Sequence, residues 1–167
     1  MPHQLPRLAL SAALIACIGA AQAQQVTVQD AWVRATVPQQ KATGAFMRLK
    51  ADKDVRLVSV STPAAPIAEV HEMKMVDNVM RMRAVQGLDL PAGKSVDLQP
   101  GGYHVMLMDL PAPVKAGDVV PLMLVFQGKD GHRETVQVQA KARSMATAAA
   151  AGGSSAGHDE HGGMHQH

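Results

Sequence analysis

The sequence predicts an all-β domain, and three of its features support this prediction. Between residues 26 and 142 apolar side chains recur at every second position, as in Val55-Arg-Leu57, and this is the period of a half-buried strand. Proline and glycine interrupt these segments at intervals of roughly ten residues, as turn formers do. No segment has the 3.6-residue period of a normal amphipathic helix. Many short strands separated by turns are typical of an antiparallel sandwich or barrel.

The expected strands follow one another along the chain without long gaps. The first begins with Val26 and Val28, which alternate with Thr27 and Gln29. A hairpin is expected around Asp77-Asn78, because both residue types tolerate the left-handed conformation of a tight turn. The pair Pro100-Gly101 and single prolines and glycines separate the later segments. The predicted strands span 26–35, 43–51, 55–62, 67–76, 79–85, 95–99, 102–110, 118–127 and 132–141.

Composition excludes several classes of function. Of 167 residues, 47% are hydrophobic and 2% aromatic, and the formal net charge is +2. This mixed-sign chain has no basic stripe and too few aromatic rings to stack bases, which argues against a nucleic-acid partner. It has 11 methionines and 8 histidines but one cysteine. With no nucleophile, acid–base pair or cofactor motif in the domain, we expect a binding protein and not an enzyme.

The N-terminus, residues 1–23, reads as a signal peptide. Arg7 precedes an apolar run over 8–21, and Ala21-Gln22-Ala23 forms an A-x-A cleavage pattern. The apolar run is too short to span a bilayer, so the mature chain should carry no transmembrane span. We expect an exported domain over 24–143, with no thiol left for disulfides or ligation. As an alternative, residues 14–17, Leu-Ile-Ala-Cys, resemble a lipobox in which Cys17 is lipidated.

The C-terminal segment, residues 144–167, consists mostly of Ala, Gly, Ser and His. It has too few large apolar residues to offset the entropy of ordering, so a disordered tail is expected. A flexible tract rich in histidine is typical of metal binding, although a solubilising tail is the alternative. The candidate metal ligands of the tail are His158, His161, His165 and His167.

Methionine and histidine share strand faces within the domain. In the expected hairpin Met73 lies opposite Met82, and His71 lies on the diagonal to Met82. Further along the chain, His104, Met106 and Met108 share one face of a strand. Core packing explains a methionine, but a buried histidine needs a polar partner. For Met47, Met108 and Met123 taken singly, we expect core packing.

The softness of these donors selects the metal. Thioethers suit Cu(I), imidazoles accept copper readily, and neither carries the negative charge that divalent ions favour. A blue-copper electron-transfer site would need a cysteine ligand, which the mature domain lacks. The residues therefore indicate that the domain holds Cu(I) through two imidazoles and two thioethers, from His71, Met82, His104 and Met106.

At these positions the sequence resembles the periplasmic PCuAC copper chaperones. Their pattern is His or Met, ten residues, Met, twenty-one residues, then His-x-Met, and His71, Met82, His104 and Met106 match every spacing. The resemblance implies a cupredoxin-like β-sandwich that binds one Cu(I) through these four residues. It also implies delivery of copper to the CuA centre of cytochrome c oxidase subunit II, together with Sco-type thiol proteins. We expect the exported protein to be a periplasmic monomer. Relatives with similar tails imply a Cu(II) site in the tail.

Two other functions use the same residues. A copper-sequestering or resistance protein would bind the metal with the same soft ligands and donate it to no acceptor. A structural β-sandwich would use the Met and His cluster only for packing. Metal binding separates the structural role from the other two, and transfer to an acceptor separates a carrier from a sequestering protein.

Overall fold

The computed structural model describes residues 25–144, and within this range every regular element is a β-strand. The predicted all-β class is therefore confirmed. Among the described residues, no helix is long and apolar enough to cross a membrane. The predicted signal peptide and the tail histidines lie outside the described residues.

Ten strands make up this part of the chain, and all nine predicted segments coincide with one of them. The additional strand, β6, has only three residues, which is too short to show an alternating pattern. The strands are β1 (Val26–Arg34), β2 (Ala42–Ala51), β3 (Val55–Ser61), β4 (Ile67–Val76), β5 (Val79–Ala84), β6 (Leu88–Leu90), β7 (Ser95–Leu98), β8 (Tyr103–Met108), β9 (Val119–Gly128) and β10 (Arg133–Arg143).

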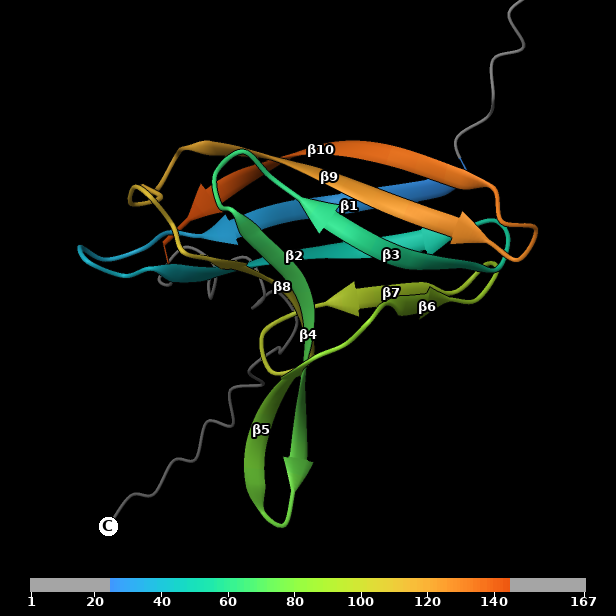
Figure 1. Ribbon diagram of the computed structural model, residues 1–167, viewed down its shortest axis with the longest axis horizontal. Helices are drawn as coiled ribbons and strands as arrows, with labels where there is room; N and C mark the ends of the chain where they lie inside the picture. The colour runs from blue at the N-terminus through green and yellow to red at the C-terminus, as the bar shows by residue number, and fades with distance from the viewer. Residues whose placement is uncertain (1–24, 145–167) are drawn as a thin grey trace, which may run out of the picture.

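The strands form one hydrogen-bonded sheet in the order β5-β4-β8-β7-β2-β1-β10-β9-β3-β6, with β2 also pairing with β8. Most pairings are antiparallel, as predicted, but β1–β10 and β7–β8 are parallel. The sheet curls over on itself: β1, β10, β9 and β3 form the upper layer in Figure 1, and β7 and β8 lie below them. The expected sandwich is thus a single curled sheet that encloses its own core.

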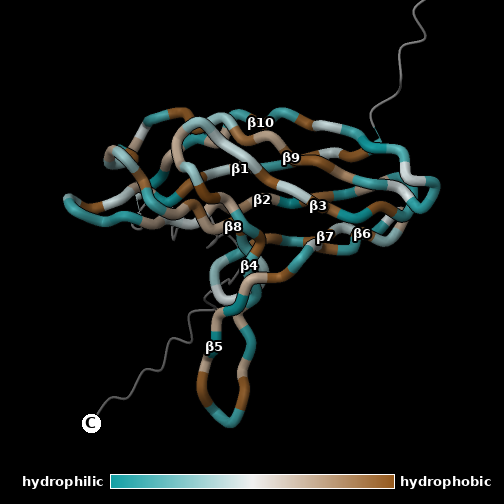
Figure 2. The backbone as a smooth tube through the Cα atoms, in the orientation of Figure 1, coloured by the Kyte–Doolittle hydropathy of each residue, from teal (hydrophilic) through white to brown (hydrophobic). Residues whose placement is uncertain are grey.

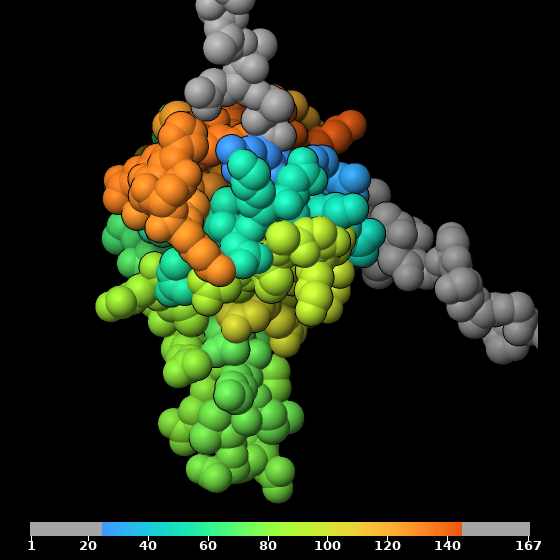
Figure 3. Space-filling model, turned by 90° about the vertical axis from the view of Figure 1, so that its right-hand side faces the viewer, coloured from blue at the N-terminus to red at the C-terminus, as the bar shows by residue number. Residues whose placement is uncertain are grey.

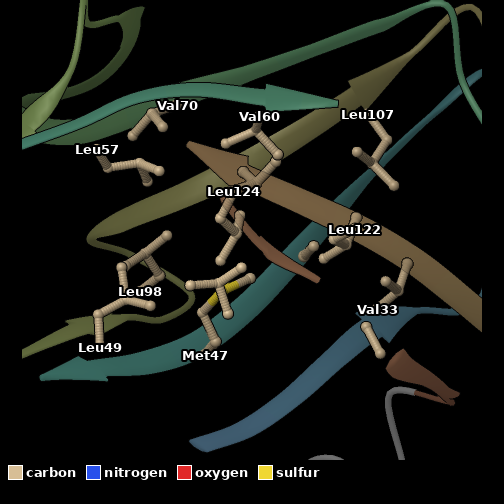
Figure 4. Packing of buried hydrophobic residues seen from close by; sticks show 14 of the residues in the cluster. Val33, Met47, Leu49, Leu57, Val60, Val70, Leu98, Leu107, Leu122 and Leu124 are labelled. Carbon is tan, nitrogen blue, oxygen red and sulfur yellow. The ribbon is translucent and has the colours of Figure 1, made fainter. Parts of the chain in front are cut away.

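Inward-facing aliphatic side chains from both layers fill this core. Leu49, Leu57, Leu107 and Leu122 are fully buried, and Figure 4 shows such residues from different strands pointing toward one another. On β8, Val105 and Leu107 point into the core. Because side chains alternate along a strand, the residues between them point to the outer face of the sheet.

The three methionines expected to pack in the core differ in burial. Met47 is buried and belongs to the core, and Met108 is half-buried. The expectation for Met123 is wrong, because its side chain is 41% exposed. On β9 the inward positions belong to its neighbours Leu122 and Leu124, so strand alternation directs Met123 outward.

A β-bulge in β1 changes which side chains face outward. The register between β1 and β2 shifts between Gln29 and Trp32, and Asp30 adopts a φ of 47°. Before the bulge Val26 and Val28 face the core, whereas after it Val33 does. An extra residue in one strand produces this change of face. Trp32 is thereby placed opposite Phe46 of β2.

The hairpin formed by β4 and β5 projects away from the body of the molecule, as Figures 1 and 3 show. Its turn is formed by Asp77 and Asn78, with φ values of 51° and 59°, as a two-residue turn of this type requires. Met73 pairs with Met82, as predicted. The base of the hairpin belongs to the sheet because β4 also pairs with β8.

Candidate metal centre

The four histidine and methionine residues selected in the domain come from three neighbouring strands. His71 of β4 lies directly opposite His104 of β8, and their ring centroids are 6.0 Å apart. Met82 of β5 and Met106 of β8 line one cavity of about 290 Å³ together with His104. Met73, which pairs with Met82, lines the same cavity. The structure therefore brings these side chains together from distant parts of the sequence.

His104 is held in an orientation that suits metal binding. Its side chain faces the outer side of β8, yet the residue is only 6% exposed. Nδ1 lies 3.1 Å from the carbonyl oxygen of Gly102, and a carbonyl can only accept, so Nδ1 carries the proton and donates it. The lone pair of Nε2 then remains available, as in histidines that bind metals.

The surroundings of His104 also favour its neutral form. Burial is the largest cause, and it lowers the pKa of His104 below its usual value. The hydrogen bond to the carbonyl of Gly102 acts in the opposite direction, and the neighbouring His71 and Arg34 side chains lower the pKa of His104 further. A neutral imidazole is the form that binds metal ions.

His71 has a similar arrangement with its two nitrogens exchanged. Nε2 lies 3.1 Å from Oε2 of Glu69. A carboxylate only accepts, so Nε2–H donates to it. Nδ1 is buried and has no hydrogen-bond partner among the described residues. Because buried polar atoms normally have partners, this nitrogen is suited to receive one from outside the chain.

The outer wall of the cavity consists of residues that the sequence analysis did not select. Phe46 is stacked on Trp32, with ring centroids 4.5 Å apart, and lies 6.3 Å from the ring of His104. Arg34 lies over the ring of Phe46, with its Cζ 5.5 Å from the ring centroid. Gly44, which pairs with Met106, leaves space for the Phe46 ring. Alternation in β2 could have placed Gly44 and Phe46 on one face, but the pairing of β2 with β8 has no signal in the sequence.

A larger cavity of about 510 Å³ lies elsewhere, where β3, β6 and β9 meet. The charged side chains that line it are already paired: Asp54 with Lys129 at 2.7 Å, and Arg56 with Asp89 at 2.6 Å. Its lining contains neither histidine nor methionine. The smaller cavity beside His104 is therefore the better candidate for a site with specific chemistry.

Comparisons with known proteins agree with this architecture. Residues 26–141 match the family model described as "Putative lipoprotein LpqE-like". A protein of Leifsonia xyli subsp. xyli, named "Putative lipoprotein Lxx21020", is 33% identical over 121 residues, which are 72% of this chain and 72% of that protein.

Solved structures show the same fold. The Cu(I) form of DR1885 from Deinococcus radiodurans is 36% identical, with a TM-score of 0.53 over 75% of this chain and 83% of that one. Its apo form is 34% identical, with a TM-score of 0.53 over 86% and 95%. The copper-bound PCuAC domain from PmoF2 is 23% identical, with a TM-score of 0.58 over 72% and 94%. These likenesses confirm the predicted cupredoxin-like fold.

Proposed function

The chain belongs to the LpqE-like family and has the fold of the PCuAC domains, and from this premise we propose that it is a copper chaperone. In this proposal the domain holds one Cu(I) as cargo on the outer face of the sheet. The ligands are two imidazoles and two thioethers, from His71, Met82, His104 and Met106.

The observation that carries this proposal is the hydrogen bonding of His71 and His104. Each has one ring nitrogen bonded to an oxygen that only accepts, which leaves the other nitrogen free to bind a metal. His104 lines the cavity together with Met82 and Met106, and the ring of His71 lies 6.0 Å from the ring of His104. In metal sites the second nitrogen of a ligating histidine is commonly held by a carbonyl or a carboxylate in this way.

The donor set favours Cu(I) over other metals. Thioether sulfur is a soft ligand that suits Cu(I), and imidazole suits copper in general. DR1885, 36% identical to this chain, has been solved in a Cu(I) form. The methionine and histidine donors need no thiolate, so they retain their chemistry in an oxidising compartment where thiols form disulfides.

We propose that the copper is passed to the CuA centre of cytochrome c oxidase subunit II, with Sco-type thiol proteins as partners. Met82, on the projecting hairpin, is 51% exposed, so an acceptor could reach the metal from that side. The alternative function is copper sequestration or resistance. In that case the exposed Met82 would allow copper to enter the site.

An exported location fits this role. The matching family and the Leifsonia relative are both named as lipoproteins, which supports export of this chain and also supports the alternative in which Cys17 is lipidated. We propose the periplasm as the compartment. Mass spectrometry of the mature protein would distinguish cleavage after Ala23 from a lipidated N-terminal Cys17.

Titration with Cu(I) under reducing conditions tests the proposed site. Wild type should bind one Cu(I) tightly, whereas the variant His71→Ala/Met82→Ala/His104→Ala/Met106→Ala should lose this binding. The control is His132→Ala/Met123→Ala, which changes an exposed loop histidine and an exposed methionine outside the cavity. Equal binding by wild type and the fourfold variant would show that the proposed site is wrong.

Delivery requires a separate experiment. Cu(I)-loaded protein is mixed anaerobically with the apo soluble domain of oxidase subunit II, with and without a thiol partner. The two proteins are then separated and the copper in each is measured, and the acceptor is oxidised with ferricyanide to reveal the spectrum of any CuA centre that has formed. A chaperone should lose its copper to the acceptor. If no copper moves under either condition, the sequestering function is favoured.

The tail is proposed as a second site that binds Cu(II). Its candidate ligands lie outside the described residues: His158, His161, His165 and His167. Truncation after Arg143 should abolish the additional Cu(II) binding and leave Cu(I) binding to the domain intact. If truncation removed both, the tail and the domain would form one site.

A further inference from the structure

We propose that Met75 and Met80, on the outer part of the β4–β5 hairpin, form an outer binding site for a soft monovalent ion and pass Cu(I) inward to the cavity. This inference rests on the proposed copper function. It concerns a pair of thioethers that lies beyond the four proposed ligands and outside the residues that line the cavity.

The hairpin register places four methionines on one face. Met75 pairs with Met80, and Met73 pairs with Met82. Since side chains of alternate residues share a face, both pairs lie on the same side of the hairpin as His71. The methionines therefore form two successive rows that extend outward from the cavity.

The backbone hydrogen bonds show that the side chains of each pair are close. Val85 N–H donates to the carbonyl oxygen of Val70 at 2.9 Å, so Val70 and Val85 form a hydrogen-bonded pair. From this pair toward the turn, non-hydrogen-bonded and hydrogen-bonded pairs of residues alternate. Met73 N–H points away from β5, because it donates to the carbonyl oxygen of Gly102 at 3.1 Å. Both methionine pairs are thus of the non-hydrogen-bonded kind, in which opposite side chains approach most closely.

These outer methionines lie outside the hydrophobic core. Met75 is 57% exposed and Met80 is 44% exposed. Figure 2 shows hydrophobic colour on both strands near the tip of the projecting hairpin. Methionine is a poor choice for an exposed strand on propensity grounds, since β-branched residues are preferred there. Methionine differs from the branched aliphatic residues in having a thioether sulfur.

The two rows provide a path for the ion. Residues two apart on a strand are about 6.8 Å apart, so the outer pair stands one short step from Met73 and Met82, which line the cavity. Copper would move by ligand exchange: bonds to the outer sulfurs break as bonds to the inner sulfurs form, and Cu(I) keeps its oxidation state. Two thioethers bind more weakly than the four inner donors, so net movement is inward.

The test uses the full chain with ¹³C-labelled methionine methyl groups, titrated with Cu(I) under anaerobic conditions. The first equivalent should shift the methyl signals of Met82 and Met106. Further Cu(I) should shift Met75 and Met80 together while Met123, an exposed methionine on β9, stays unshifted. Unshifted Met75 and Met80 at excess Cu(I), or an equal shift at Met123, would overturn the outer site.

Variants test the path inward. Met75→Leu/Met80→Leu retains the apolar bulk but removes both sulfurs. It should load the inner site severalfold more slowly from a Cu(I)–chelator complex, with unchanged affinity at equilibrium, whereas Met123→Leu should load at the wild-type rate. Equal loading rates for all three proteins would overturn the relay. If Met82 and Met106 themselves fail to respond to the first equivalent, the proposed copper function fails instead.

Discussion

Gly44 leaves the space that the ring of Phe46 occupies beside the cavity. A Cβ atom at residue 44 would lie 2.8 Å from Cζ of Phe46, which is closer than real Cβ atoms come to other atoms. The ring has little freedom to withdraw, because Trp32 is stacked against it and Arg34 lies over it. The wall of the candidate centre therefore depends on the absence of a side chain at this position.

We expect Gly44→Ala to destabilise the apo protein by about 1–3 kcal/mol, the usual effect of an overpacked methyl group. Urea denaturation monitored by Trp32 fluorescence measures this change. Gly102→Ala is the matched control, because a Cβ atom there would meet its nearest neighbours at 3.7 Å, an ordinary contact. Equal losses of stability in the two variants would show that contact with Phe46 is not the cause.

The buried imidazole of His104 makes the stability of the apo protein depend on pH. Its pKa is lowered in the folded state, mainly by burial. As the pH falls below about 6.5, the unfolded chain takes up a proton at this residue while the folded chain does so only at lower pH. Between the pKa of His104 in the unfolded chain and its lower pKa in the folded chain, protonation therefore favours unfolding. The free energy of unfolding is highest above this pH range and falls as the pH decreases through it.

Urea midpoints of wild type and His104→Gln, measured from about pH 8 down to about pH 5, check this prediction. As the pH falls below the pKa of histidine in the unfolded chain, the urea midpoint of wild type should decrease more steeply than that of His104→Gln. His132→Gln, at an exposed loop position, is the control and should follow the wild-type curve. Parallel curves for wild type and His104→Gln would contradict the assignment.

Among the elements, the β4–β5 hairpin has the least support from the rest of the fold. Its outer half projects from the sheet (Figure 3), and every residue of β5 is exposed. Its conformation therefore depends on local interactions, above all on the turn. Asp77 and Asn78 both have positive φ, which asparagine tolerates better than other non-glycine residues and β-branched residues tolerate poorly.

Asn78→Val should therefore open the hairpin locally, with a cost of about 1–2 kcal/mol at the turn. Amide hydrogen exchange at the outer residues of β4 and β5 should become faster, while exchange in β9 and β10 stays unchanged, because local opening is independent of the core. Asn78→Gly preserves the turn and is the control. If Asn78→Val left exchange in the hairpin unaltered, the turn would not govern its stability.

The elements themselves could be predicted well, because an alternating pattern reports directly on a strand with one buried face. The turn at Asp77 and Asn78 fixed the pairing of Met73 with Met82, and the structure has this register. The bulge in β1 left no comparable signal, and it alone directs Trp32 toward Phe46. The prediction that Met123 packs in the core is wrong because it relied on the residue type alone. The position of Met123 between the inward-facing residues of β9 directs its side chain to the outer face of the sheet.

Spacing along the chain selects candidate members of the site but does not predict their arrangement in space. Spacing along the chain selected His71 and His104, yet their direct opposition depends on β4 pairing with β8. Strand order is a property of the whole sheet, and the alternating pattern within each strand does not reveal which strands pair. For the same reason the wall contributed by β2, with Phe46 and Gly44, appears only when the sheet is assembled.

At the scale of the whole molecule, the proposed ligands form a site only in the folded chain. They come from β4, β5 and β8, which lie side by side at one end of the sheet. In the unfolded chain the same donors are separated by spacers of ten and twenty-one residues. A metal that binds the folded state alone must shift the folding equilibrium toward that state.

Cu(I) should accordingly stabilise the whole domain, by about 2.7 kcal/mol when its free concentration is a hundredfold above the Kd. Urea denaturation under reducing conditions should give a higher midpoint with an unchanged slope, because the same surface is exposed on unfolding. The fourfold alanine variant at the proposed ligands should show no such increase, and the chain truncated after Arg143 should show all of it. If Cu(I) raised the midpoint of the fourfold variant as much as that of wild type, the stabilising site would lie elsewhere in the molecule.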